Sequence, residues 1–235
     1  MKIITWNCNM AFRNKAEIIL KQRPDILIVP ECEHPDRLNY KEEFMANDTF
    51  WHGDLVSKGI GVFAYGNYKI KLNKNFKEEY KFVLPLSVSN EKEEFSLFAI
   101  WAQKPEKHTN YIEQVWNAVH YYEDLLKLPN TILIGDFNSN TIWDKPRREI
   151  NHSRLVEILA NKQIVSTYHH SNKIEQGKET HPTLFMQRKF EKPYHIDFCF
   201  VSKDLLNKLS KVEVGEFKDW GIYSDHMPLT VTFKN

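Results

Sequence analysis

Short strand-like runs recur along the whole chain and constrain its fold more than any other feature. Each run is rich in Ile, Val and Phe and is bounded by Asn, Gly, Pro or Lys, as strands of globular proteins are. The sequence predicts strands at Lys2 to Trp6, Asp25 to Pro30, Gly59 to Tyr65, Lys81 to Val88, Phe95 to Trp101, Thr131 to Gly135, Thr183 to Gln187, His195 to Val201 and Leu229 to Phe233. Ile26 to Val29 and Ile132 to Ile134 are continuous apolar runs, which are typical of central strands covered on both faces.

Amphipathic helices are predicted between some of these strands. Apolar residues recur at helical spacing from Asn14 to Gln22, from Tyr111 to Leu128 and from Asn151 to Lys162. Strand, helix and strand come first, several strands follow, and alternation resumes later. This order predicts an α/β fold with two packed sheets and helices outside. No linker or repeat divides the chain, so we expect one domain over residues 1–235.

Composition narrows the classes of function. The 32 basic and 31 acidic residues give a net charge of +1, so any nucleic-acid contact has to come from a local basic patch. Cys8, Cys32 and Cys199 have no paired spacing, which favours buried thiols in a reducing cytoplasm. No apolar run approaches the ~20 residues of a membrane helix. We expect a cytoplasmic protein with no obligate protein partner and with surface loops at polar stretches such as His170 to Glu179.

Two polar residues come directly after the first two predicted strands. Asn7 offers an amide to a metal-bound water or a phosphate, although taken alone it is better explained as a strand-ending turn residue. Glu31 leaves a buried strand, where a carboxylate is costly unless it is paired, hydrogen-bonded or holding a cation. Magnesium often uses only one or two such carboxylates. Glu33 is the alternative ligand, because strand alternation puts it on the same side as Glu31.

Three further motifs carry groups that can move a proton. Asp136 and Asn138 lie two apart, and in an extended segment they share a face and can orient one water molecule. Asp197 lies between apolar residues and can orient an imidazole. Asp225 and His226 precede the last strand. Singly, each motif is explained by a turn or a surface strand. Together they are the parts needed for metal-assisted attack of water on a phosphate ester.

These motifs resemble those of the endonuclease/exonuclease/phosphatase superfamily, which includes deoxyribonucleases, abasic-site endonucleases, inositol polyphosphate 5-phosphatases and bacterial sphingomyelinases. The resemblance extends from Ile3 to about Phe233. The matching motifs are Thr5-Trp6-Asn7, Pro30-Glu31, Gly135-Asp136-Phe137-Asn138, His195-Ile196-Asp197 and Ser224-Asp225-His226-Met227-Pro228-Leu229. The resemblance implies a four-layer α/β sandwich, in which two facing mixed β-sheets are flanked by helices and the site lies at one edge.

The resemblance also implies a role for each residue. Glu31 would be the chief magnesium (Mg²⁺) ligand, with Asn7 nearby and Asp225 beside the metal, and Mn²⁺ is expected to substitute. The catalytic group would be Asp136, Asn138, Asp197 and His226. Asp136 would activate the attacking water with help from Asn138, and His226 would contact the scissile phosphate with Asp197 behind it.

One position departs from the pattern of the superfamily. Many members have a His or Tyr that touches the phosphate at the end of the strand that matches Phe98 to Trp101. Here Trp101 holds that place and is the candidate for this substrate contact. Tryptophan has one N–H donor and cannot accept a proton. His108 and His181 are candidates to compensate.

A loop rich in basic and aromatic residues follows the Asp136 motif. Trp143, Arg147 and Arg148 in this loop are candidates to bind a phosphate backbone and to stack a base. The leading expectation is therefore a magnesium-dependent phosphodiesterase that acts on nucleic acid. The alternatives are a phosphatase or phosphodiesterase of a small phosphorylated molecule or lipid headgroup, and a non-catalytic binding module with the same fold.

Overall fold

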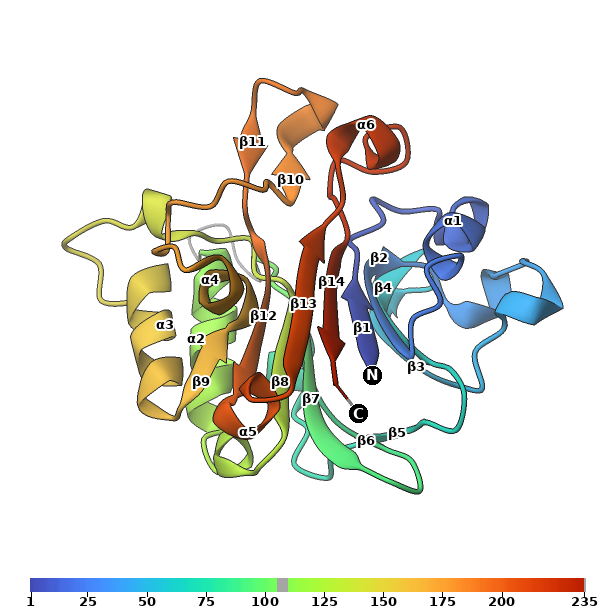
Figure 1. The fold of residues 1–235 in the computed structure, drawn as a ribbon, viewed down its shortest axis with the longest axis horizontal. Helices are drawn as coiled ribbons and strands as arrows, with labels where there is room; N and C mark the ends of the chain where they lie inside the picture. Colours follow the sequence, from blue (N-terminus) through green and yellow to red (C-terminus); the bar gives the residue numbers. More distant parts are fainter. Residues whose placement is uncertain (105–109, 235) are drawn as a thin grey trace.

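Two six-stranded mixed β-sheets pack face to face in the computed structural model, which describes residues 1–104 and 110–234 (Figure 1). The first sheet has the order β13-β14-β1-β2-β4-β3. Its strands are β1 (Lys2–Thr5), β2 (Ile26–Cys32), β3 (Asp48–Leu55), β4 (Lys58–Ala64), β13 (Leu209–Val214) and β14 (Leu229–Phe233). Only β1 and β2 pair in parallel, and the other neighbours in this sheet are antiparallel.

The second sheet has the order β5-β6-β7-β8-β12-β9. Its strands are β5 (Lys69–Leu72), β6 (Val83–Ser89), β7 (Glu94–Trp101), β8 (Thr131–Asp136), β9 (Ile164–Ser166) and β12 (Asp197–Ser202). Here β7 and β8 form the parallel pair. A small hairpin of β10 (Leu184–Phe185) and β11 (Pro193–Tyr194) stands apart from both sheets.

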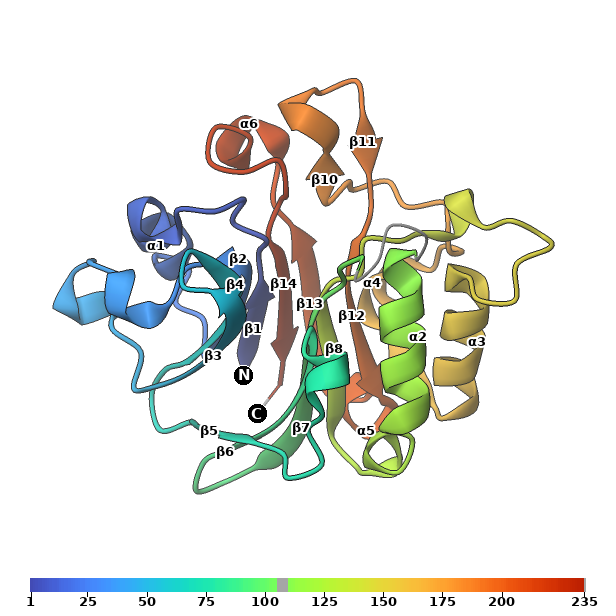
Figure 2. The ribbon, with the colours of Figure 1, turned by 180° about the vertical axis from the view of Figure 1, so that it is seen from behind.

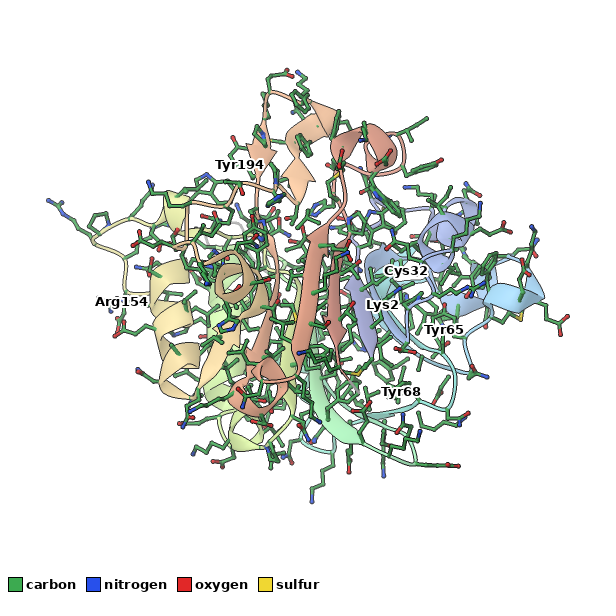
Figure 3. All side chains as sticks on the ribbon, viewed as in Figure 1. Lys2, Cys32, Tyr65, Tyr68, Arg154 and Tyr194 are labelled. Carbon is green, nitrogen blue, oxygen red and sulfur yellow. The ribbon has the colours of Figure 1, made fainter. Side chains whose placement is uncertain are left out.

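Helices lie on the outer faces of the sheets and, as α5 (Lys203–Leu206) and α6 (Phe217–Trp220), at the lower and upper ends of the sandwich (Figure 1). The others are α1 (Ala16–Leu20), α2 (Tyr111–Tyr121), α3 (His152–Asn161) and α4 (Thr167–Asn172). In the view from behind, α2 and α3 lie side by side over the second sheet, and α1 lies beyond the first (Figure 2). Arg154 projects from the outer side of α3, away from the sheets (Figure 3). Within the described residues, no helix is both long and apolar enough to span a membrane.

Three apolar clusters explain this layering. One lies between the sheets and combines residues such as Ile28 and Val62 with Leu97 and Ile134. The second joins the other face of the second sheet to α2 and α3, and the third joins the first sheet to α1. Side chains alternate between the two faces of a strand, so a strand covered on both faces is apolar throughout. The four-layer arrangement expected from the sequence is therefore confirmed.

The predicted elements differ from the observed ones mainly in length. The helix predicted to reach Leu128 ends at Tyr121 and is followed by a turn and a short 3₁₀ segment. The strand predicted at Thr183 to Gln187 contains only the two residues of β10. The polar stretch at His170 to Glu179 is not a simple surface loop, because α4 includes its beginning and the Glu179 side chain is buried. The three cysteines are buried free thiols, as expected.

One edge of the sandwich collects segments from both ends of the chain. Figure 1 marks both termini at the lower ends of β1 and β14, so the chain leaves β1 and enters β14 at the upper edge. The indole Nε1 of Trp6 donates to the backbone carbonyl of His226 at 2.9 Å, and the Ser224 hydroxyl donates to the carbonyl of Asn7 at 2.7 Å. These bonds fasten the segment before β14 to the segment after β1.

Candidate active site

Two carboxylates and an imidazole meet at this upper edge. Asp136 is the last residue of β8, and Asp197, the first residue of β12, is its antiparallel partner. His226 lies just before β14 and forms an isolated bridge with Leu184. One ligand atom from each of Asp136, Asp197 and His226 lies within 4.8 Å of the others, and all three residues are buried. Three distant segments of the sequence therefore form one site.

His226 is held in place by a carboxylate. Its Nδ1 lies 2.9 Å from Oδ2 of Asp197. Burial opposes the positive charge on the imidazole, but the carboxylates of Asp197 and Asp136 outweigh this effect and raise the pKa of His226. The imidazole is therefore cationic at neutral pH. The other Asp197 oxygen, Oδ1, is buried and has no hydrogen-bond partner among the described residues.

Asp136 accepts hydrogen bonds from amides on both sides. Its Oδ2 accepts from the Asn7 side chain at 3.0 Å and from the Asn138 side chain at 2.9 Å, and its Oδ1 accepts from the Asn138 backbone N–H at 2.9 Å. Burial raises the pKa of this carboxyl, although the His226 charge and these hydrogen bonds oppose the shift. The sequence predicted that Asp136 and Asn138 lie on the same face of an extended segment. The structure contradicts this prediction, because the chain is not extended at Asn138. Its φ of 47° turns the chain, and its side chain reaches back to Asp136.

Glu31 occupies a β-bulge at the end of β2. Its φ is +63°, and the register of β2 with β4 shifts between Pro30 and Cys32. The bulge interrupts the normal alternation of side chains. Glu33 therefore does not lie on the same side as Glu31, and it is not placed as an alternative ligand. The Glu33 carboxylate is buried and is bound instead to the Arg13 guanidinium and to the backbone N–H groups of Phe12 and Arg13.

The Glu31 carboxylate remains partly open, with 20% of the side chain exposed. Its Oε1 lies 3.4 Å from the Asn7 side-chain amide nitrogen, and its Oε2 lies 3.2 Å from the Lys58 ammonium. Asn7 contacts both Glu31 and Asp136 and therefore connects the two carboxylates. The first sheet thus contributes Glu31 and Asn7 to the same site as Asp136.

Asn9 connects Asp225 to the same group of residues. Its side-chain nitrogen donates to Oδ1 of Asp225 at 2.9 Å, and its backbone N–H donates to Oδ1 of Asn7 at 3.0 Å. Glu31, Asn7 and Asp225 present carboxylate and amide oxygens, which are the ligands that hard divalent cations prefer. The residues present therefore fit a magnesium-like ion.

The spacing of Asp136, Asp197 and His226 also suits a cation. However, a direct bond between Nδ1 of His226 and Oδ2 of Asp197 needs a proton between these two atoms, so they do not both face a metal. The oxygen set around Glu31 is therefore the better candidate for the cation, and the Asp–His pair for proton transfer and phosphate contact.

The residues predicted to contact substrate lie in different environments. Trp101 is only 4% exposed and packs in the core between the sheets, although β7–β8 pairing places it directly beside Asp136. Arg147 is exposed. Trp143 is 43% exposed, and its ring lies 5.0 Å from that of Tyr194, which Figure 3 labels on β11.

A groove of about 320 Å³ adjoins the site beside Asn138. Trp143 and Arg148 line it together with Lys104 and Tyr111, and the Lys104 ammonium lies 4.7 Å from the Tyr111 ring centroid. The groove thus combines cationic groups with aromatic faces.

Neither histidine considered as a replacement for Trp101 is placed at the site. His108 lies outside the described residues. The Nδ1 of His181 lies 2.8 Å from the Tyr168 hydroxyl, and its backbone carbonyl accepts from Nδ1 of His195 at 2.7 Å. His181 therefore belongs to a neighbouring polar cluster.

Comparison with solved structures identifies the fold. The 3′-5′ exonuclease from Neisseria meningitidis aligns over 100% of both chains with a TM-score of 0.73 and 16% sequence identity. An AP endonuclease from Archaeoglobus fulgidus also aligns over 100% of both chains, with a TM-score of 0.69 and 16% identity. The endonuclease domain of the retrotransposon TRAS1 covers 99% of this chain and 97% of its own, with a TM-score of 0.69 and 13% identity.

The chain has the endonuclease/exonuclease/phosphatase fold. No protein-family model matches the sequence, and no curated protein matches it either. Below 25% identity, similarity of structure establishes the fold and leaves the chemistry to be argued from the site.

Within the endonuclease/exonuclease/phosphatase fold, several residues at the site escaped the sequence analysis. Asn9 and Lys58 contact Asp225 and Glu31, as described above. Thr183 accepts the backbone N–H groups of Ile196 and Asp197 on its hydroxyl at 2.9 Å, which fixes the start of β12. These residues have no motif of their own, and only the strand register reveals them. The spacing of Asn7 and Asn9 was the one available signal.

A buried cluster of histidines supports the loop after Asp136. His152 Nδ1 lies 2.8 Å from the Ser139 hydroxyl, and the Asn140 side chain donates to the backbone carbonyl of His195 at 2.8 Å. Burial lowers the pKa of His152 and of His195 to about 4. Both rings are therefore neutral in the folded protein at neutral pH.

We expect these histidines to make the protein sensitive to acid. The unfolded chain binds protons at each histidine near pH 6.5, but the folded chain binds them only near pH 4. The two neutral rings make their full contribution to the unfolding free energy above pH 6.5, and this contribution is lost as the pH falls toward 4. Between pH 7.5 and pH 5, each histidine should cost about 2 kcal/mol of unfolding free energy. Urea denaturation at the two pH values measures this loss.

The His152→Gln variant is the matched control, because it removes one titrating group and retains a polar side chain beside Ser139. Between the same pH values, the change in its unfolding free energy should differ from that of the wild-type protein by about 2 kcal/mol, which is the contribution of His152. An identical pH dependence in the wild-type and variant proteins would contradict this assignment.

Proposed function

We propose that the protein is a magnesium-dependent phosphodiesterase that cleaves nucleic acid. One observation carries the proposal. Asp136 lies beside the hydrogen-bonded Asp197–His226 pair, and the Asn7 side chain connects Asp136 to Glu31. The solved structures with this fold include a 3′-5′ exonuclease and AP endonucleases. A second structure of the same Neisseria enzyme, in a single-residue variant, is described as a 3′ phosphatase bound to product DNA hairpin, with 17% identity and a TM-score of 0.70 over 100% of both chains.

Glu31, Asn7 and Asp225 would hold Mg²⁺, which when bound would neutralise negative charge on the phosphate and the leaving oxygen. Asp136 would take the proton from the attacking water. The amides of Asn7 and Asn138 both donate to its Oδ2, so the carboxylate has a fixed direction. Its raised pKa brings it closer to the neutral range in which a general base works best.

His226 would contact the scissile phosphate as a cation. Asp197 holds its Nδ1 at 2.9 Å, which fixes the orientation of the ring and favours the charged form. The imidazolium would then stabilise the negative charge that develops on the phosphoryl oxygens. It would donate its proton to the leaving oxygen as the P–O bond breaks, while Asp136 takes the proton of the attacking water. Asp197 acts through His226 and is a positioning residue.

The groove beside Asn138 supports a nucleic acid substrate over a smaller one. Lys104 and Arg148 supply positive charge, and Tyr111 and Trp143 supply ring faces on which a base can stack. This local patch compensates for the low net charge of +1. Arg147, exposed on the same loop, would add a phosphate contact.

The test is a cleavage assay with Mg²⁺ or Mn²⁺ at low salt on plasmid, abasic duplex, single-stranded DNA and RNA, and simple phosphoester reporters. We expect metal-dependent cleavage of at least one nucleic acid. Hydrolysis of the reporters alone would favour a phosphatase or phosphodiesterase of a small phosphorylated molecule or lipid headgroup, which the near-neutral charge also suits. Inactivity on the whole panel would favour a binding module.

Replacing Glu31 with alanine should weaken Mn²⁺ binding by at least tenfold, because a partly exposed carboxylate of the oxygen set is lost. Isothermal titration calorimetry measures the affinity directly.

Glu33→Ala serves as a comparison, since its carboxylate is bound to Arg13. It should lower stability while metal affinity stays near that of the wild type. Unchanged Mn²⁺ binding in Glu31→Ala would refute the assignment of this ligand.

A further inference from the structure

Lys58 reaches the site from β4, a strand that carries none of the motifs described above. Its ammonium lies 3.2 Å from Oε2 of Glu31 and 5.0 Å from the centroid of the Trp101 ring. Cations are attracted both to carboxylates and to aromatic faces. The 35% exposure of the Lys58 side chain places this contact at the mouth of the site.

The backbone that carries Lys58 is fixed by close packing. Lys58 is the first residue of β4, and at Gly59 an added Cβ would lie 2.4 Å from both the His52 carbonyl oxygen and the Trp51 ring. The Trp51 indole in turn donates to the carbonyl of Cys32 at 3.0 Å. The β3–β4 hairpin is therefore fastened to the end of β2 beside Glu31, and the direction of Lys58 follows from this packing.

Trp101 provides the other side of this contact. It is held edge-on by Phe82 at 5.3 Å between ring centroids. Its Nε1 is buried and has no partner among the described residues. Trp101 is paired with Asp136 in the β7–β8 register, so a cation over its ring lies close to the carboxylate that we assign as the base.

A short series of contacts connects the ammonium to the reacting groups. Glu31 binds Lys58 through Oε2 and meets the Asn7 amide nitrogen through Oε1, and the same nitrogen lies 3.0 Å from Asp136. Only Glu31 and Asn7 separate Lys58 from Asp136 along this path. A divalent cation on Glu31 would compete with the ammonium for the same oxygens, and a released ammonium over the Trp101 ring would still face the site.

We propose that Lys58 is a phosphate-binding residue of the active site. Without a metal ion, Glu31 binds the Lys58 ammonium, and a divalent cation that binds Glu31 displaces the ammonium so that it can contact phosphate. The inference rests on the proposed function. It assigns to the Lys58–Trp101 pair the positive contact with phosphate that an indole alone does not supply. Lys58 thus touches substrate, and Trp101 positions it.

The test compares Lys58→Met and Lys58→Gln, which remove the charge, with Lys58→Arg, which keeps it. Calorimetry without substrate should show Mn²⁺ binding about fivefold tighter in the uncharged variants, the scale of a partly exposed ion pair. Inorganic phosphate, titrated in the presence of saturating Mn²⁺, should bind about tenfold more weakly to them. Lys58→Arg should stay within about threefold of the wild type in both measurements.

Lys71→Met is the matched control, because Lys71 is an exposed lysine on β5. Both affinities should be unchanged in this variant. Unchanged phosphate affinity in both uncharged Lys58 variants, or Mn²⁺ binding weaker than in the wild type, would overturn the proposal. Both binding measurements can be made on an inactive protein, so they test the role of Lys58 alone. The cleavage assay on the wild-type protein tests the proposed function separately.

Discussion

Replacing His226 with alanine should lower kcat for phosphodiester cleavage by roughly 10³- to 10⁴-fold, the range expected when a proton donor that also stabilises charge is lost. The imidazole is the cation that Asp197 and Asp136 keep charged in a buried site. Its removal also leaves Asp197 without its partner, and the unfolding free energy should fall by about 3 kcal/mol. Single-turnover cleavage and urea denaturation measure the two effects, and circular dichroism should show the fold retained.

His226→Gln separates catalysis from stability. Glutamine has an amide that can donate to Asp197, so much of the lost stability should return while kcat stays low. If His226→Ala kept more than a tenth of the wild-type kcat, the assigned role of the imidazole would be wrong.

Replacing Asp136 with asparagine should lower kcat by about 10³-fold or more. The change keeps the size of the side chain but removes the group that accepts the proton of the attacking water. The three hydrogen bonds that Asp136 accepts from Asn7 and Asn138 would then have a weaker acceptor. Measurements of kcat between pH 5.5 and 8.5 should also show the loss of any rise in rate that reflects ionisation of this carboxyl.

Asn138→Ala is the control for this prediction. It removes one amide donor to Asp136 and leaves the carboxylate in place, so kcat should fall by about tenfold, much less than in Asp136→Asn. Equal losses in the two variants would indicate that Asp136 acts through the loop geometry and not as the base.

The layers of the fold were predictable because their central strands are unambiguous. The continuous apolar runs of β2 and β8 are buried almost throughout, as central strands are. Strands β3, β5, β9, β11 and β13 were not predicted. Of these, β3, β5 and β13 are edge strands with exposed residues such as Leu55, Lys69 and Lys211, and edge strands of this kind lack a clear apolar pattern. Their position depends on pairing with neighbours that are distant in the sequence.

The site was predictable where a motif ends a strand and unpredictable where tertiary packing supplies the group. Asp136, Asp197 and His226 were identified from motifs, and the structure brings them together. The error concerning Glu33 came from assuming regular alternation through a β-bulge. Lys58 had no local signal, since it reaches Glu31 only through the pairing of β2 with β4.

The antiparallel pairing of β1 with β14 determines when, during synthesis of the chain, the active site can form. Asn7 is made early and His226 late, so a nascent chain still short of its last strand lacks both the imidazole and the strand that docks it against β1. A nascent chain that lacks β14 therefore lacks a complete site, and we expect the site to form only after this strand has folded against β1. For the same reason, one proteolytic cut ahead of Ser224 that frees this strand would switch the molecule off.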